Sequence, residues 1–173
     1  MVLFEETARL FLETSRAEAH VRAQLRDGLM VAFSAAAAAI FGFALANESA
    51  KVALVVVPYL AFGVASLLGQ HNVAIHALSR YQVDGLRKFL GDGSNQPPLW
   101  ESSQNLRSWQ PRLLILTLTG QIVVLVAPSV FALALVPYHV SGHVFWGTII
   151  GGVLTLLTVA LLLYAFVIRF QRP

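Results

Sequence analysis

The chain has 173 residues, of which 57% are hydrophobic and 12% are charged, with no cysteine and a formal net charge of +3 at pH 7. Soluble domains carry about 25% charged residues, so this composition argues against a water-soluble globular protein and favours a single membrane domain over residues 1–173. The lack of cysteine excludes disulfides, thiolate metal sites and a cysteine nucleophile, and the basic residues lie beside apolar runs rather than in one patch, so no nucleic-acid partner is predicted.

Residues 1–27 are predicted to form a cytoplasmic amphipathic helix. Its apolar or small residues recur every three or four positions and make one stripe: Leu3, Thr7, Leu10, Thr14, Ala17, Val21 and Leu25. We expect this helix to run straight into the first span and to pack, stripe to stripe, against a second cytoplasmic helix. The alternative is an interfacial helix that lies flat on the lipid headgroups.

Four apolar runs are predicted to be transmembrane helices: residues 28–46, 52–69, 113–136 and 144–168. Each is close to or within the length of about 17–25 residues that crosses about 30 Å of hydrocarbon. The connections after the first and third runs are short, so consecutive spans should form two helical hairpins. The predicted fold is an all-α, four-transmembrane-helix bundle in which the first two helices extend into the cytoplasm.

The segment between the second and third spans is predicted to have two parts. Residues 70–90 continue the second helix out of the membrane, because apolar residues keep the helical spacing there. Residues 91–111 should form a cytoplasmic loop, since Gly91-Asp92-Gly93 and Pro97-Pro98 disfavour regular structure.

The distribution of basic residues predicts the orientation. Four Lys or Arg precede the first span, five lie between the second and third, two follow the fourth, and only Lys51 lies in an opposite loop. By the positive-inside rule, both termini and the central segment are cytoplasmic. We expect a multi-pass protein of the bacterial inner membrane, with the lipid bilayer as its first partner.

Ionisable side chains are absent from the hydrocarbon-depth portions of the four predicted spans. Proton relays and ion-coupled transporters keep such groups at depth, so this kind of transporter is disfavoured. Gln121 is the strongest polar residue at depth and lies one helical turn from Thr117. Its amide is expected either to make an interhelical hydrogen bond or to line a pore.

The fourth span carries small residues on one face, Thr148, Gly152 and Thr155, with Gly151 and Thr158 adjacent. Such a face lets helices approach closely, either within one subunit or between subunits of a homo-oligomer.

A polar group marks the end of the second span, where Gln70, His71 and Asn72 are followed by His76. It is interpreted either as a pH-sensitive or ligand-binding collar or as a set of interfacial hydrogen bonds. Further candidates for contact with a cytoplasmic protein partner are Tyr81, Trp100 and Glu101. No catalytic, metal-binding or cofactor-binding residue is predicted, because nucleophile elbows, phosphate-binding glycine loops and zinc-protease motifs are all missing, and we do not expect an enzyme.

A resemblance to small bacterial four-helix membrane proteins rests on the pattern Gln70-His71-Asn72-x-x-Ile75-x-x-Leu78-x-x-Tyr81, followed by Leu86 and by Leu99-Trp100-Glu101. The overall layout is also similar to that of membrane effectors or membrane subunits in anti-phage defence. The resemblance is one of architecture and carries over no functional residue.

The leading functional hypothesis is an oligomeric membrane protein whose cytoplasmic helices receive a signal and whose spans form a pore or perturb the membrane. The alternatives are a non-conducting scaffold that recruits a soluble partner and, with weaker support, a membrane-embedded enzyme.

Overall fold

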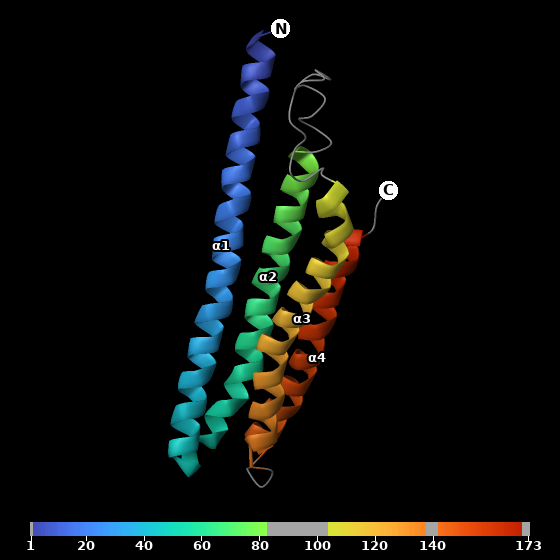
Figure 1. Ribbon diagram of the computed structural model, residues 1–173. Helices are drawn as coiled ribbons and strands as arrows, with labels where there is room; N and C mark the ends of the chain where they lie inside the picture. The colour runs from blue at the N-terminus through green and yellow to red at the C-terminus, as the bar shows by residue number, and fades with distance from the viewer. Residues whose placement is uncertain (1, 83–103, 138–141, 171–173) are drawn as a thin grey trace.

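The computed structural model describes residues 2–82, 104–137 and 142–170, and all regular secondary structure in them is helical (Figure 1). The elements in chain order are α1 (Val2–Ala46), the 3-10 helix η1 (Glu48–Val55), α2 (Val56–Arg80), α3 (Gln104–Leu135) and α4 (Gly142–Phe170). Each of the four α-helices is long and apolar enough to cross a membrane. The all-α fold class and the four helices of span length are therefore confirmed.

Helix α1 is one unbroken helix of 45 residues, which corresponds to about 67 Å (Figure 1). The chain leaves it at Asn47, whose backbone is extended, with φ −134° and ψ 112°. An ion pair between Arg22 and Glu18, one turn apart, supports the helix in its first half. The predicted cytoplasmic helix and the first predicted span thus belong to the same rod. If residues 28–46 cross the bilayer, residues 2–25 project along the same axis and do not lie flat on the headgroups.

Most of the predicted cytoplasmic stripe is exposed and does not pack on α2; of its described residues, only Val21 and Leu25 come near α2, where they line a cavity with His71. Leu10 and Val21 are 61% and 51% exposed, whereas Leu12 and Ser15 are buried. Helix α1 contacts α2 with the face that carries Leu12 and Ser15 and that continues at helical spacing toward Phe33 and the rest of the core. Since α1 is straight, the face that packs in the first span also determines which face packs beyond it.

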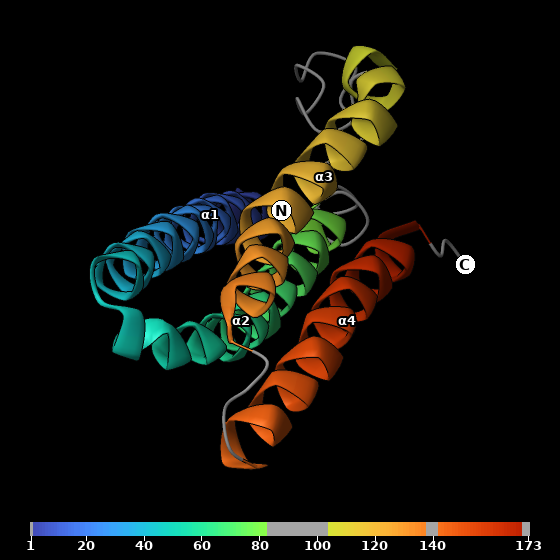
Figure 2. The same cartoon turned by 90° about the horizontal axis from the view of Figure 1, so that it is seen from below.

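Helix α2 lies at the centre of the bundle and contacts α1, α3 and α4 (Figure 2). Of the most apolar stretch of each helix, 39% is buried in α2 but only 17% in α1. Small residues at four-residue spacing, among them Ala61, Ala65 and Gly69, form the buried face of α2 and let its neighbours approach. The start of the second predicted span differs in detail, because Val52–Val55 belong to the 3-10 helix that precedes α2.

Helix α3 begins earlier than expected. We expected a loop over residues 91–111, but α3 starts at Gln104 and continues through Pro111, so the last eight residues of that stretch are helical. A proline inside a helix removes one backbone donor, and membrane helices tolerate this where neighbouring groups satisfy the backbone. The remainder of the predicted loop and residues 83–90 of the second helix lie outside the described residues.

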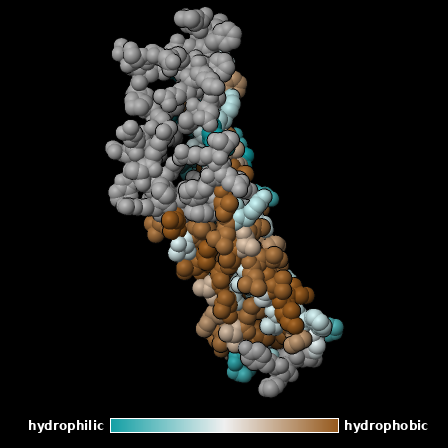
Figure 3. All heavy atoms as spheres, turned by 90° about the vertical axis from the view of Figure 1, so that its right-hand side faces the viewer, coloured by the Kyte–Doolittle hydropathy of each residue, from teal (hydrophilic) through white to brown (hydrophobic). Residues whose placement is uncertain are grey.

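The outer faces of the bundle are apolar. Val31 of α1, Leu116 of α3 and Leu156 of α4 are each about 70% exposed, at 70%, 69% and 73%. Figure 3 shows a broad hydrophobic band over one face, bounded at its lower end by hydrophilic residues. A surface of this kind is suited to lipid rather than to water.

Candidate functional site

A hydrogen bond between amide side chains joins α2 to α3. Asn72 Nδ2 donates to Gln121 Oε1 at 3.5 Å, and Gln121 is 6% exposed. A buried amide needs a partner in an apolar environment, and here that partner lies on a neighbouring helix. Thr117, one turn before Gln121, is exposed, so the two do not form a shared buried polar surface.

The polar group that follows the second predicted span does not converge on one point. Successive residues of a helix are about 100° apart, and Gln70 is exposed, His71 is half-buried toward α1, and Asn72 is half-buried toward α3. His76 is half-buried and Tyr81 is 49% exposed. Trp100 and Glu101 lie outside the described residues. The residues of the predicted collar therefore do not form one site. Gln70, His71 and Asn72 lie in three separate environments around one helix.

His71 lines a cavity of about 420 Å³ between α1 and α2. The α1 residues of this cavity are Val21, Gln24, Leu25, Gly28, Leu29 and Ala32. The His71 Nδ1 atom is buried and has no hydrogen-bond partner among the described residues. The cavity thus has one polar wall, on α2, and a mostly apolar wall on α1.

Two contacts show that the apolar parts of the helices are offset along the bundle axis. Asn72, three residues beyond the predicted end of the second span, meets Gln121, eight residues inside the predicted third span. A Cβ atom at Gly69 would lie 3.1 Å from Leu161 Cδ2, and Leu161 is seven residues inside the predicted fourth span. At about 1.5 Å per residue, the apolar surfaces of α3 and α4 extend roughly 10–16 Å past the predicted end of the second span.

In α4, the glycine that packs against its neighbours is Gly151, which lies next to Gly152 of the predicted small-residue face. A Cβ atom at Gly151 would lie 2.9 Å from Pro58 Cγ and 3.1 Å from Leu133 Cδ2, whereas one at Gly152 would meet no atom within 4 Å. Thr155, which is buried, lies on the packed face with Gly151. The sequence alone could not distinguish Gly151 from Gly152, because the difference depends on which of them faces Pro58.

The threonine hydroxyl groups of the fourth span are bonded within their own helix. Thr148 Oγ1 donates to the Val144 carbonyl and Thr155 Oγ1 donates to the Gly151 carbonyl, both at 2.9 Å. These threonines therefore present their methyl groups to their surroundings.

A second hydrogen bond, which sequence reasoning missed, joins α1 to Gln82, two residues after the end of α2. Gln82 Nε2 donates to Ser15 Oγ at 3.0 Å, and both residues are buried, at 4% and 7% exposure. Ser15 Oγ in turn donates to the Leu12 carbonyl. The available signal was the run of small or apolar residues on the α1 face opposite the obvious stripe.

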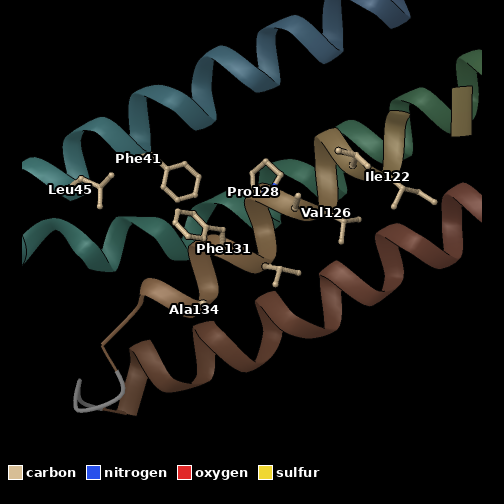
Figure 4. Close-up of a pocket in the computed structure, with 10 residues that line it drawn as sticks. Phe41, Leu45, Ile122, Val126, Pro128, Phe131 and Ala134 are labelled. Atoms are coloured by element: carbon tan, nitrogen blue, oxygen red, sulfur yellow. The ribbon is translucent and has the colours of Figure 1, made fainter. Parts of the chain in front are cut away.

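An apolar groove of about 980 Å³ lies between α1 and α3 (Figure 4). Its lining residues are Phe41, Leu45, Ile122, Val123, Val126, Ala127, Pro128, Val130, Phe131 and Ala134. The rings of Phe41 and Phe131 face each other across it, with centroids 5.6 Å apart. All of these residues belong to the predicted spans, so the groove offers contact to hydrocarbon but has no polar side chain for chemistry.

Charged side chains lie outside this region. In the turn after α1, Lys51 Nζ is 2.7 Å from Glu48 Oε1, and the hydrogen bond and charge of Lys51 lower the pKa of that exposed carboxyl. Within the described residues, no three His, Asp or Glu side chains are grouped so that they could hold a metal ion. The candidate features of the described residues are therefore hydrogen bonds between helices and apolar grooves.

Comparison with known proteins gives no match to a protein-family model, a curated protein or a solved structure.

Proposed function

We propose that this chain is an oligomeric integral membrane protein of the bacterial inner membrane, with both termini cytoplasmic. Its cytoplasmic helices receive a signal or a protein partner, and its spans then open a pore or perturb the bilayer. The observation that carries the proposal is the unbroken helix α1, which joins the predicted cytoplasmic segment and the first predicted span in one 45-residue rod.

In this proposal, α1 is the helix that moves relative to the rest of the bundle when a signal arrives. Its packing supports this role. Helix α1 is held mainly along one face, by α2, and the most apolar stretch of α1 is only 17% buried. Near its cytoplasmic end, the bond from Gln82 to Ser15 fastens it to the end of α2. A partner that breaks this contact would change the position of the whole rod, because a continuous helix transmits displacement along its length.

A conduction path between subunits fits the polar groups better than a path through one bundle. The Gln121 amide bonds to Asn72, and the hydroxyls of Thr148 and Thr155 bond to carbonyls of their own helix. These groups are therefore not directed at a common channel within the subunit. A pore gated by apolar surfaces needs no buried charge, so this arrangement remains compatible with conduction through an oligomer.

A non-conducting scaffold that recruits a soluble partner is the second candidate. It is favoured by the same internal satisfaction of polar groups, since a scaffold needs no hydrated path. It also uses the exposed cytoplasmic face of α1, where Leu10 and Val21 are available for contact. A role in anti-phage defence enters either proposal only through the similarity of layout.

Sizing in mild detergent combined with ion flux in liposomes tests the two candidates. The pore proposal expects a defined oligomer and flux of a small-ion dye or tracer that depends on the oligomer. The scaffold proposal expects no flux at any protein-to-lipid ratio or in the presence of cytosolic extract. If the protein is a monomer or dimer and gives no flux either with or without cytosolic extract, the pore proposal is excluded.

A further inference from the structure

The cavity between α1 and α2 combines an apolar wall with one buried polar atom that lacks a partner. On the α1 side, Gln24 is its only polar lining residue among the described residues. The Gln24 amide lies 3.0 Å from His20 Nε2, so part of its bonding capacity is already used. On the α2 side, His71 Nδ1 is buried and has no hydrogen-bond partner among the described residues. The cavity therefore surrounds a single polar position that the neighbouring side chains leave unsatisfied.

Water is a poor occupant for most of this space. A buried water molecule needs two to four polar partners, and the lining offers only the His71 imidazole and the Gln24 amide. The cavity lies beside interior turns of α1 and α2, whose backbone groups bond within their own helices. One water molecule takes about 30 Å³, a small part of the cavity volume of about 420 Å³. An occupant that fills the cavity must be largely apolar.

The size and lining of the cavity are typical of a small-molecule site. Such sites have volumes of about 300–1,000 Å³ and are lined mostly by apolar side chains, with a few polar groups that fix the orientation of the ligand. At about 420 Å³, this cavity is near the lower end of that range. The His71 Nδ1 atom donates or accepts according to its tautomer, and a carboxyl or hydroxyl group can bond to it in either case. The chemistry therefore selects a compact aliphatic molecule with one such head group.

We propose that this cavity binds a single-chain amphiphile of the fatty-acid type. Its head group bonds to His71 Nδ1, and its chain lies against the α1 wall that includes Leu25, Leu29 and Ala32. The volume is too small for both chains of a phospholipid. The inference goes beyond the proposed function and does not depend on it, since one subunit forms the cavity without an oligomer or a pore.

Gly28 provides room for the chain and gives the sharpest test. It lines the cavity, and a Cβ atom there would meet no other atom within 4 Å. Gly28→Leu therefore fills the space without pushing the helices apart, and leucine favours a helix more than glycine does. Gly42→Leu is the matched control, because Gly42 is on the same helix, is equally uncrowded and does not line the cavity.

Photoaffinity labelling of the full chain in mild detergent measures binding at the cavity. The probe is dodecanoic acid with a diazirine near the end of its chain, and the labelled residues are mapped by mass spectrometry. We expect labelling within residues 21–32 of α1 and around His71. It should fall about fivefold in Gly28→Leu and stay unchanged in Gly42→Leu. Equal labelling of these residues in the two variants would overturn the proposal.

Replacement of His71 tests the head group separately from the chain. His71→Leu keeps a bulky side chain in the cavity wall and removes the hydrogen bond at Nδ1. Labelling by the acid should fall about fivefold, whereas labelling by the corresponding photoreactive alkane should stay the same or rise. An equal loss with both probes would mean that His71 only shapes the cavity, and would overturn the proposal. Stronger labelling of the cavity by a photoreactive two-chain phospholipid than by the acid would also overturn it.

Discussion

Gly151 of α4 occupies the closest approach of three helices. A Cβ atom there would lie 2.9 Å from Pro58 Cγ, which belongs to a ring and cannot rotate away, and 3.1 Å from Leu133 Cδ2. Replacement by alanine forces α4 to shift from α2, and overpacking of this kind costs about 1–3 kcal/mol. We expect Gly151→Ala to lower the midpoint of thermal unfolding, followed by tryptophan fluorescence in detergent.

Gly152→Ala is the matched control for this prediction. A Cβ atom at Gly152 meets no atom within 4 Å, and alanine favours a helix over glycine by about 1 kcal/mol. The midpoint should therefore stay the same or rise. Equal losses in the two variants would contradict the packing role assigned to Gly151.

The amide pair of Gln121 and Asn72 makes a second prediction for single residues. Gln121→Leu removes the acceptor of the 3.5 Å bond and leaves the Asn72 amide facing an apolar side chain. Hydrogen bonds between membrane helices contribute about 0.6 kcal/mol on average and rarely more than about 1.7 kcal/mol. We expect Gln121→Leu to lower the free energy of unfolding by an amount in that range. A double-mutant cycle with Asn72→Leu should show that the effects of the two substitutions are coupled. Additive losses would mean that the two amides do not interact.

At the scale of the elements, the pairing of α1 with α2 depends on Ser15 and Gln82. Ser15→Ala removes the acceptor and leaves a buried amide without its partner, which costs about 1–3 kcal/mol. Hydrogen exchange should become faster in residues 2–25 of α1 and stay unchanged in α3. Thr14→Ala is the control, because Thr14 is exposed and bonds only within its own helix. Similar exchange in the two variants would show that the contact does not hold α1.

Sequence reasoning predicted which segments are helical more reliably than which faces pack. Long apolar runs are sufficient to predict four span-length helices, and an uninterrupted helical pattern predicted the continuity of α1. The face on which its first half packs was not predictable in the same way. Leu10 and Leu12 are equally apolar, and only the burial of Phe33 in the core and the contact of Ser15 with Gln82 decide between the two faces.

The candidate site was predicted in part, for a related reason. An amide at depth, Gln121, indicated that an interhelical partner was needed, but four residues between 70 and 76 could have supplied it. The register between α2 and α3 selects Asn72, and register depends on the contacts of two whole helices. Gln82 was overlooked because a glutamine near the end of a helix is usually solvated.

At the scale of the whole molecule, the orientation predicted from basic residues can be tested with cysteines. Ser49→Cys lies in the turn after α1 and Arg80→Cys at the end of α2, and both sites are exposed. We expect a membrane-impermeant maleimide to label Ser49→Cys from the outside of spheroplasts and to label Arg80→Cys only after lysis. The reverse pattern would invert the proposed topology.

The offset between the apolar parts of the helices has a consequence for the surrounding lipid. At the cavity, residues 21–32 of α1 lie at the same height along the bundle axis as His71 of α2. This stretch of α1 includes Arg22 and Arg26. In the proposed membrane placement, a bilayer thick enough for α3 and α4 would bring hydrocarbon to the level of these arginines, so lipids beside α1 would thin locally or the protein would tilt. Each ångström of such mismatch costs a fraction of a kcal/mol. In a bilayer with longer acyl chains, the mismatch would therefore be largest on the α1 side of the protein. Bilayer thickness would then influence the position of α1.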